Sequence, residues 1–306
     1  MTMGRPIRAA HFNSGAYRMD FRAIVMGVAF SLMWSSAFAT ARIIVADAPP
    51  LHALALRFLI SGLIAVALAR ALGQTWHLTR AQWRATFVFG LCQNGIYLGL
   101  NFVAMQSVEA SLASIIASTM PLLVAALGWA AYGEKVRPLG LLGLSGGLLG
   151  VAIIMGARVS GGVDLAGVAL CGIGALALAF ATLTLRGATS GGNLLMVVGL
   201  QMLVGSILLI IPALLFESAD VTLSAPLILA FVYQMFIPGL LATMIWFSLV
   251  GRIGAIRASS FHFLNPFFGV ATAALLLGEA IRPLDMLGVG VIMAGILAVQ
   301  LSKARL

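Results

Sequence analysis

Charged side chains are scarce in this chain. They make up 9% of its 306 residues, whereas hydrophobic side chains make up 61%, and the mean hydropathy is +1.09. A water-soluble protein of this length needs a far more polar surface. The composition therefore excludes a soluble globular protein and predicts a chain that lies within a lipid bilayer.

Cysteine is also scarce, and the residue clusters that carry catalysis are missing. The two cysteines, Cys92 and Cys171, fall in separate apolar runs and are expected to be small buried residues, not a disulfide or a metal pair. No Cys or His cluster has metal-ligand spacing, and no glycine-rich phosphate loop follows a strand pattern. We therefore expect no metal, no cofactor, no enzymatic activity and no use of ATP by this chain alone.

Acidic residues are few, and none falls near the middle of an apolar run. All nine lie in loops or at the ends of runs: Asp20, Asp47, Glu109, Glu134, Asp164, Glu217, Asp220, Glu279 and Asp285. A carboxylate near the bilayer centre is the usual carrier of a coupling proton or sodium ion. The sequence therefore favours a mechanism without a coupling ion, with His262 as the one candidate for proton linkage.

What the chain does contain is ten apolar runs of membrane-spanning length. A helix of roughly 20 residues crosses the ~30 Å hydrocarbon core. The ten predicted spans are residues 22–42, 52–72, 82–104, 110–132, 138–156, 164–185, 193–215, 226–249, 256–277 and 284–302. The links between them are mostly shorter than about ten residues, which leaves no room for a soluble catalytic domain.

The chain is also a duplication. The Gly, Glu, Arg, Pro, Leu and Gly of segment 133–143 recur at the same spacing 145 positions later, in segment 278–288. Each copy holds five spans, and an odd number forces the second copy to cross the membrane in the opposite sense. We therefore predict an all-α integral membrane protein with two inverted five-helix repeats, residues 22–156 and 164–302, after an N-terminal segment, residues 1–21.

The basic residues predict the orientation of the chain. The net charge of +9 does not indicate a nucleic-acid partner, because the 18 Lys and Arg residues are dispersed as single loop charges. With the N-terminus inside, all of them fall on or near the cytoplasmic side except Arg42, Arg57, Arg158 and Arg282. Cytoplasmic loops collect Lys and Arg. Both termini are therefore predicted to be cytoplasmic, in a multi-pass protein of the cell inner membrane.

Three stretches of the sequence resemble a known family: LMWSSAF at residues 32–38, LRFL at residues 56–59, and the long segment 108–150. They are similar to the drug/metabolite transporter superfamily, specifically its EamA-type ten-helix members, although Ser35 stands where many relatives carry Gly. Within that superfamily the chain looks most similar to the YddG-type amino-acid exporters. The resemblance implies a central cavity surrounded by the first, third, fourth, sixth, eighth and ninth helices, with the fifth and tenth at the periphery.

The fifth and tenth spans carry glycines at close helical spacing. Gly143 with Gly147, and Gly146 with Gly150, lie four apart, and the tenth span holds Gly288 and Gly295. Small residues four apart let helix backbones approach closely. We favour tight packing within one chain, hence a monomer, over a dimer interface.

Polar residues on helical faces mark the expected substrate path, because polar groups inside a bilayer need a partner or a cavity. In the third span, Asn94, Tyr97 and Asn101 share one face. In the fourth span, Ser111, Ser114 and Ser118 have the same spacing, but serine hydroxyls also bond to their own helix, so both interpretations stay open.

The ninth span places Ser259, His262 and Asn265 before Pro266, and Pro121 is the matching proline of the fourth span. Proline kinks a helix and frees a backbone carbonyl. The freed carbonyls line a transport site and the kinks serve its gating, or the kinks only allow the helices to pack; both interpretations stay open. His262 is either a neutral imidazole bonded to a neighbouring helix or a titrating group.

Aromatic side chains on the expected cavity helices are Trp34, Tyr97, Tyr233 and Trp246, with Gln234 beside them. They suit an amphiphilic guest, but belts at the water interface use the same residues.

Two further groups of charged residues have expected roles. Arg57, about 9 Å into the second span by the ~1.5 Å rise per residue, is expected to snorkel outward or to pair with Asp47, in preference to binding a substrate carboxylate. Glu134 with Arg137, and Glu279 with Arg282, are expected to brace the two repeated hairpins.

Together these features predict an inner-membrane transporter that exports amino acids, aromatic or neutral, or similar small metabolites by alternating access. Its expected partners are a small-molecule substrate and the lipid bilayer. A multidrug or toxic-compound exporter is the alternative. A cation site is expected to contain a membrane-embedded carboxylate, which the sequence lacks, unless an aromatic cage binds the cation instead. A membrane-embedded enzyme would need an acid, base, metal or nucleophile constellation that the sequence lacks.

Overall fold

The computed structural model describes residues 21–132, 137–184, 193–253, 258 and 261–304, and all regular structure in these ranges is helical. Within these described ranges, nine helical segments are long and apolar enough to cross a membrane, and a further apolar segment, Phe261–Leu277, is shorter. The chain is thus an all-α membrane protein with the expected series of ten spans.

Six spans are single helices. They are α1 (Phe21–Asp47), α2 (Pro50–Ala71), α7 (Pro138–Ser160), α8 (Leu165–Thr184), α9 (Leu194–Phe216) and α14 (Pro283–Ala304). The other four spans are interrupted: the third is α3 (Arg80–Phe89), η1 (Gly90–Leu98) and α4 (Gly99–Ala104), the fourth α5 (Ala110–Ser118) and α6 (Met120–Tyr132), the eighth α10 (Ala225–Gln234), η2 (Met235–Leu241) and α11 (Ala242–Ile253), and the ninth η3 (Phe261–Leu264) and α13 (Asn265–Leu277). The interrupted spans are four of those that the resemblance places around a cavity.

Proline accounts for the breaks in the fourth and ninth spans. In the fourth span, helix α5 ends at Ser118, and Thr119 separates it from α6, which contains Pro121. In the ninth span, a short 3-10 helix ends just before Asn265 and Pro266. Proline disfavours α-helical geometry in the residue before it and cannot donate a hydrogen bond to the preceding turn. The structure therefore has a helix interruption at each of the two matching prolines.

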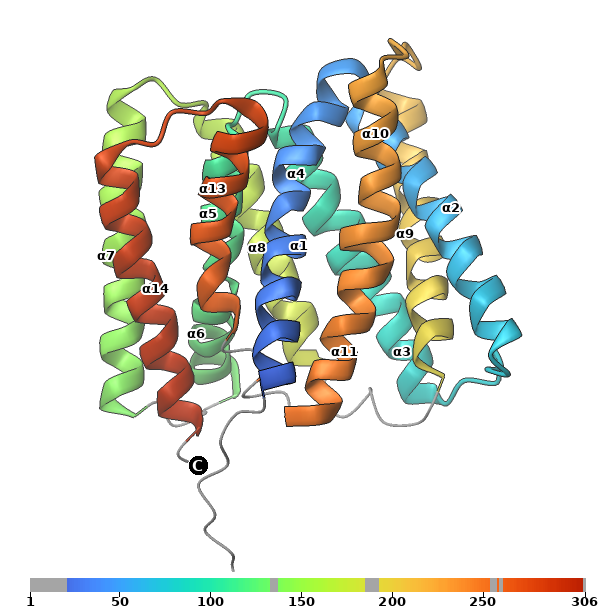
Figure 1. Cartoon of the computed structure of the whole chain (residues 1–306), viewed down its shortest axis with the longest axis horizontal. Helices are drawn as coiled ribbons and strands as arrows, with labels where there is room; N and C mark the ends of the chain where they lie inside the picture. Colours follow the sequence, from blue (N-terminus) through green and yellow to red (C-terminus); the bar gives the residue numbers. More distant parts are fainter. Residues whose placement is uncertain (1–20, 133–136, 185–192, 254–257, 259–260, 305–306) are drawn as a thin grey trace, which may run out of the picture.

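Related helices of the two repeats pack together in pairs. Helix α7 packs on α14, and α2 packs on α9, and the α7–α14 pair forms one edge of the bundle (Figure 1). The α7–α14 contact is built on glycine: a Cβ on Gly143 would lie 2.6 Å from the carbonyl oxygen of Gly295. The glycine-rich faces are therefore occupied within one chain, as expected, whereas Gly146 has no neighbour at its Cβ position.

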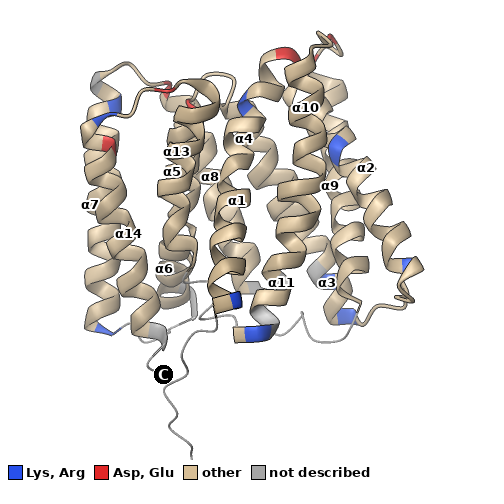
Figure 2. Ribbon diagram, in the orientation of Figure 1, with Lys and Arg blue, Asp and Glu red and all other residues tan. Residues whose placement is uncertain are grey.

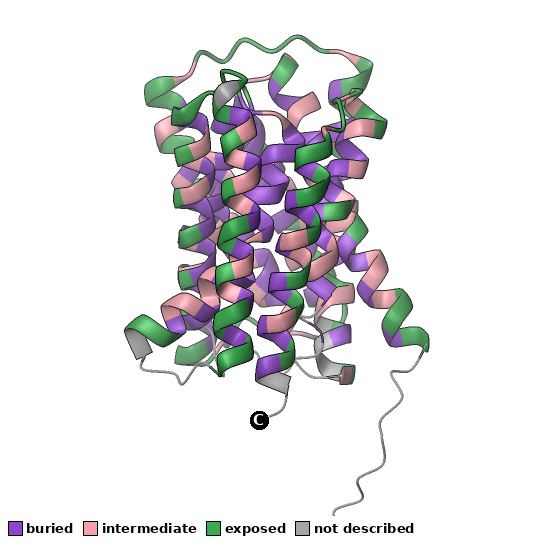
Figure 3. Ribbon diagram, turned by 90° about the vertical axis from the view of Figure 1, so that its left-hand side faces the viewer, coloured by how far each residue is buried: buried purple, intermediate pink, exposed green. Residues whose placement is uncertain are grey.

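The outer surface of the bundle is apolar. In Figure 3 the buried residues face the interior of the bundle and the exposed ones face outward. The exposed side chains include many leucines, for example Leu142, Leu148 and Leu214. Such a surface is suited to contact with lipid chains and not with water.

The acidic residues gather at one end of the bundle, although some arginines, including Arg158 and Arg282, lie there too (Figure 2). We call this end the acidic end because it holds all the described acidic residues: Asp47, Glu109, Asp164, Glu217, Asp220, Glu279 and Asp285. The opposite end, where α1 begins and α14 ends, is the basic end and carries Arg22, Arg70, Arg80, Arg84, Arg137 and Arg252.

Carboxylates at the acidic end cap helices. Glu217 accepts hydrogen bonds from the backbone N–H groups of Leu51 and His52, at the start of α2. Asp164 accepts from Ala166 N and Gly167 N at the start of α8. The Ser107 hydroxyl also donates to Asp164, at 2.5 Å, and this bond is the main reason that the pKa of Asp164 lies below its usual value. Negative groups stabilise helix N-termini, where unpaired N–H groups point outward.

The expectation that Glu279 braces its own hairpin with Arg282 is wrong. The Glu279 carboxylate instead accepts from Ala110 N at 2.7 Å and Ser111 N at 3.0 Å, at the start of α5, and Arg282 Nη2 lies 3.4 Å from Glu109 Oε1. A carboxylate prefers helix N–H groups that lack an intrahelical partner. Arg137 is the exposed residue before α7, and Glu134 lies outside the described residues.

A buried ion network lies beside this cap. Arg158 of α7 donates to Asp285 of α14, with Nη2 to Oδ2 at 2.5 Å and Nε to Oδ1 at 3.3 Å, and both side chains are almost fully buried. Arg158 Nη1 also bonds Glu109. This network ties the fourth, fifth and tenth spans together at the acidic end.

Candidate functional site

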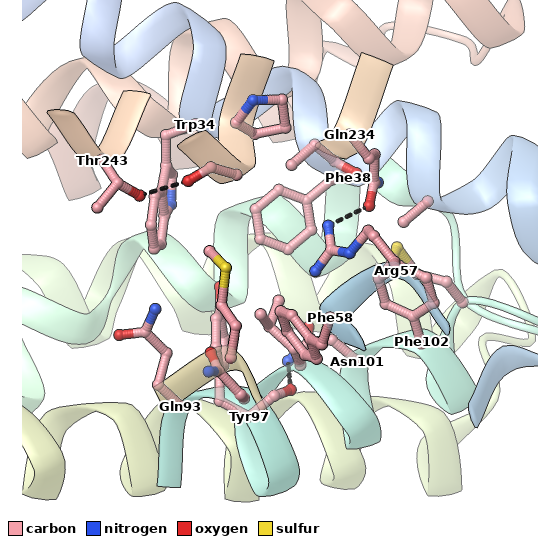
Figure 4. A pocket seen from close by; sticks show the side chains of 18 residues that line it. Trp34, Phe38, Arg57, Phe58, Gln93, Tyr97, Asn101, Phe102, Gln234 and Thr243 are labelled. Atoms are coloured by element: carbon pink, nitrogen blue, oxygen red, sulfur yellow. Dashed lines mark hydrogen bonds between the residues drawn. The ribbon is translucent and has the colours of Figure 1, made fainter. Parts of the chain in front are cut away.

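A cavity of about 70 Å³ lies in the half of the bundle formed by α1, α2, α9 and the third and eighth spans. Its walls are Trp34, Ala37, Phe38 and Ala41 of α1, Arg57 and Phe58 of α2, Met202 of α9, Gln93, Asn94, Tyr97, Leu98, Asn101 and Phe102 of the third span with Met105 after it, and Gln234, Pro238, Gly239 and Thr243 of the eighth (Figure 4). Both repeats thus contribute to it.

The two wall segments η1 and η2 share an unusual backbone. Both are π-helical, and their first residues, Gly90 and Met235, are 145 positions apart, which is the offset of the sequence repeat. Segments of π-helix are rare and often occur at functional sites. The two repeats therefore present the same local geometry to the cavity from opposite spans.

The expected polar face of the third span lies on the cavity. Asn94, Tyr97 and Asn101 all line it and are almost fully buried. Asn94 Nδ2 donates to the carbonyl of Gln201 at 2.9 Å, and Asn101 Nδ2 donates to the carbonyl of Tyr97 at 2.8 Å. The Oδ1 atom of Asn101 is buried without a hydrogen-bond partner. An unpaired buried acceptor is unfavourable unless something else bonds to it.

Arg57 is part of the cavity, which corrects the expectation that it snorkels or pairs with Asp47. Its side chain is buried at 6% exposure, and Nη1 donates to Gln234 Oε1 at 2.5 Å. Asp47 instead accepts a hydrogen bond from Ser224 Oγ. Arg57 therefore points into the bundle, where it lines the cavity.

Gln234 lines the cavity as expected and is held in place from two sides. Its Nε2 donates to the carbonyl of Ala37 at 2.7 Å and to Thr40 Oγ1 at 3.1 Å, while its Oε1 faces Arg57. Its neighbour Tyr233 points elsewhere, with its hydroxyl 2.7 Å from Ser36 Oγ. Tyr233 is not among the lining residues.

The serine face of the fourth span does not line this cavity. Ser118 Oγ donates to the carbonyl of Ser114, one turn back in the same helix, at 2.7 Å. Ser114 packs so closely on α13 that a Cβ on Gly269 would overlap its Oγ. Helix α5 packs mainly on α13, and none of the three serines is a lining residue of this cavity.

His262 lies in an aromatic cluster beside the cavity. Its ring centroid is 5.0 Å from that of Trp246, 5.4 Å from that of Phe30 and 6.3 Å from that of Trp34. Trp34 belongs to both the cluster and the cavity wall, whereas His262, Trp246 and Asn265 are not lining residues. The expected group around His262 is thus a packed neighbour of the site, and Ser259 lies outside the described residues.

The hydrogen bond of His262 is local. Asn265 Nδ2 lies 2.9 Å from His262 Nδ1, three residues away on the same span. With the amide nitrogen as donor, Nδ1 accepts, and the ring in its neutral form carries its proton on Nε2. Of the two interpretations of His262, a neutral imidazole or a titrating group, this geometry fits the neutral imidazole. Its hydrogen-bond partner, however, lies on the same span and not on a neighbouring helix.

Several lining residues carried no distinctive sequence signal. Phe38, Phe58 and Phe102 stand among many other apolar residues. Gln93 directly precedes Asn94, and helical spacing places neighbouring residues on different faces, so Gln93 was not grouped with Asn94, Tyr97 and Asn101. Thr243 could have been noticed as a polar residue four positions after Gly239, whose carbonyl accepts its hydroxyl hydrogen bond at 2.7 Å. The described residues contain no group of three His, Cys, Asp or Glu side chains able to hold a metal.

The family model of the EamA-like transporter family matches residues 21–156 and again residues 165–301. The chain belongs to the EamA-like transporter family. The family model thus fits the chain twice, once over each half, which agrees with the duplication in the sequence. The helical architecture and the paired packing of α2 with α9 and α7 with α14 also fit two repeats.

Curated relatives of similar length carry transporter names. The "Uncharacterized transporter YvbV" of Bacillus subtilis is 27% identical over 90% of each chain, and the "Uncharacterized inner membrane transporter YedA" of Escherichia coli K12 is 27% identical over 93% of this chain and 94% of its own. The "Probable amino-acid metabolite efflux pump" of Salmonella typhimurium is 25% identical over 87% of this chain and 90% of its own.

A solved crystal structure has a similar fold. It covers 93% of this chain and 98% of its own, with a TM-score of 0.66 and 20% sequence identity. This likeness shows the fold alone, and the family match makes the chain a multi-pass membrane transporter.

Proposed function

We propose that this transporter exports amino acids, aromatic or neutral, or similar small metabolites across the cell inner membrane by alternating access. The observation that carries the proposal is the cavity: it is small, lined by both repeats, and has aromatic walls with a few buried polar groups. The name of the Salmonella relative, an amino-acid metabolite efflux pump, supports the same substrate class.

The chemistry of the cavity argues against a cationic drug as the main substrate. None of the lining residues is acidic, and the one ionised side chain among them is Arg57. A cationic guest would meet a like charge in a low-dielectric site, which is unfavourable. The same lack of a cavity carboxylate supports transport without a coupling proton or sodium ion.

The charge asymmetry of the chain supports an orientation with both termini inside. The basic end, which holds the start of α1 and the end of α14, would face the cytoplasm. Fusing green fluorescent protein after Leu306 should give fluorescent cells, and fusing alkaline phosphatase there should give inactive enzyme. The reverse pair of results would place the C-terminus outside.

The experiment that tests the proposal measures uptake by proteoliposomes that hold the purified protein, with no imposed ion gradient. Radiolabelled phenylalanine, tryptophan, methionine and threonine are offered singly, and empty vesicles give the background. We expect saturable uptake of at least one amino acid, with competition among the unlabelled ones. Uptake of ethidium but of no amino acid would replace the proposal with the multidrug alternative.

A further inference from the structure

Arg57 is a buried cation without a counter-ion. Its side chain is 6% exposed, its Nε has no hydrogen-bond partner, and no carboxylate in the described part of the chain pairs with it. Within the described residues, the guanidinium donates from Nη1 to the neutral amide oxygen of Gln234. A buried charge without a partner is costly, and inside a bilayer such a residue marks a functional site.

The surroundings orient the guanidinium without neutralising it. Its central carbon lies 4.7 Å from the ring centroid of Phe58 and 5.6 Å from that of Phe102. Gln234 is anchored by two donations from its Nε2, to Ala37 and Thr40, so its Oε1 stays directed at Arg57. The group is held in place (Figure 4), and its charge remains available to a guest.

The sequence repeat offers an internal comparison. The position related to Arg57 by the offset of 145 is Met202 of α9, which packs against α2 and also lines the cavity. A methionine therefore fills the matching place in the other repeat, so the helix packing itself does not demand a cation there. The charge of Arg57 is a feature of the cavity and not of the repeat architecture.

A second unsatisfied polar group lines the same cavity. Asn101 uses its Nδ2 on the carbonyl of Tyr97, and its Oδ1 is left buried without a partner. Arg57 thus presents an unused donor, and Asn101 an unused acceptor. A carboxylate accepts from a guanidinium, often through two hydrogen bonds, and an ammonium donates to an amide oxygen.

We propose that Arg57 binds the carboxylate of the transported molecule and that Asn101 Oδ1 accepts from its ammonium group, so the substrate class is zwitterionic α-amino acids. This inference rests on the proposed transport function and assigns the recognition residues within it. Arg57 supplies the selectivity for the carboxylate, and aromatic side chains line the cavity around it.

The sharpest test gives Arg57 a counter-ion of its own. In Gln234→Glu an almost isosteric carboxylate would occupy the place of the amide oxygen that Arg57 now contacts at 2.5 Å. We expect uptake of labelled L-phenylalanine to fall at least tenfold, while the Tm of the purified protein stays the same or rises. Arg57→Met, which copies Met202, should lose uptake to a similar degree. Arg70→Met, an exposed arginine on the same helix, should stay within twofold of the wild type.

Competition separates the two ends of the substrate. Unlabelled 3-phenylpropionate, which keeps the carboxylate, should compete with L-phenylalanine in the wild type, and 2-phenylethylamine, which keeps only the amine, should compete at least tenfold more weakly. In Asn101→Leu the preference of the protein for L-phenylalanine over 3-phenylpropionate should shrink. Equal competition by the two analogues, or unchanged uptake in both Arg57→Met and Gln234→Glu, would overturn the proposal while leaving amino-acid transport intact.

A binding measurement separates failure of this inference from failure of the transport function. If 3-phenylpropionate or L-phenylalanine raises the Tm of the wild type but not of Arg57→Met, the carboxylate site stands even where vesicles take up no amino acid. If neither compound changes the Tm and neither is transported, both proposals are wrong.

Discussion

The carbonyl oxygen of Gly288 lies where a side chain on Gly150 would need to be. A Cβ built on Gly150 would approach that oxygen to 2.8 Å, and a Cβ on Gly288 would approach the carbonyl oxygen of Gly150 to the same distance. Contacts this short do not occur at real Cβ atoms, so either substitution must push α7 and α14 apart. Together with Gly143 and Gly295, the pair sets how closely α7 and α14 can approach each other.

Gly150→Ala is therefore expected to destabilise the protein. Overpacking at such a contact costs roughly 1–3 kcal/mol. Gly146→Ala, on the same helix but with no atom within 4 Å of its Cβ position, is the matched control. It should be neutral or stabilise by up to about 1 kcal/mol, because alanine is the better helix former. Thermal unfolding of the two purified variants would compare them, and equal Tm values would contradict this account of the interface.

The ion pair between Arg158 and Asp285 should be needed for folding. Both side chains are almost fully buried, at 3% and 2% exposure, and their closest atoms are 2.5 Å apart. Removing one partner of a buried pair typically costs about 3–5 kcal/mol because the other charge is left behind. Asp285→Ala is expected to reduce the yield of folded protein sharply, and the double variant Arg158→Met with Asp285→Leu should recover part of it.

The control for that prediction is Asp220→Asn, an exposed acid at the same end of the bundle. Surface charges contribute little to stability, so its yield should match the wild type. Wild-type yield in Asp285→Ala, measured by fluorescence-detected size exclusion, would show that the network is dispensable.

The architecture was predictable because it depends on features that can be measured along the sequence itself. Apolar run length gave the spans, the offset of 145 gave the repeat, and the spacing of Asn94, Tyr97 and Asn101 identified a polar face that does line the cavity. In each case the pattern depends on helix geometry alone.

The rest of the site depends on how each helix is rotated about its axis. In a span that is apolar all round, no amphipathic stripe indicates the inward face. Arg57 and Ser118 illustrate this: Arg57 was expected to snorkel to the outer headgroups or to pair with Asp47, and it lines the cavity. For Ser118 both a cavity position and a bond to its own helix were open, and its hydroxyl bonds its own helix. Packing of α2 on α9 and of α5 on α13 decides these rotations, and a single sequence does not specify it.

Glu279 is expected to stabilise the start of α5 and not its own hairpin. Its carboxylate accepts from two backbone N–H groups there, at 2.7 and 3.0 Å. Loss of a helix cap costs about 1 kcal/mol. Glu279→Ala should therefore lower the Tm clearly, and Glu279→Gln, which keeps an acceptor, should lower it less. Arg282→Ala removes only a half-exposed contact at 3.4 Å and should have little effect. Equal losses in Glu279→Ala and Arg282→Ala would restore the hairpin interpretation.

His262 is expected to support transport through Trp34 and not by carrying a proton. Its ring packs edge-on against the indole of Trp34 at a centroid distance of 6.3 Å, and Trp34 forms part of the cavity wall. His262→Ala would leave a void behind the indole, and such voids loosen the side chains that line them. Uptake should fall, while insertion and yield in the membrane are retained.

His262→Phe distinguishes packing from proton transfer. Phenylalanine fills most of the space among Phe30, Trp34 and Trp246 but cannot bind a proton. If the ring acts by packing, His262→Phe should retain clearly more uptake than His262→Ala, and the wild-type rate should not follow an imposed pH gradient. If His262 carries a coupling proton, both variants should lose uptake equally, and the wild-type rate should rise and fall with the gradient. Equal loss of uptake in both variants, with a wild-type rate that follows the pH gradient, would refute the uncoupled mechanism. The proton carrier would then be His262, because no lining residue of the cavity is a carboxylate.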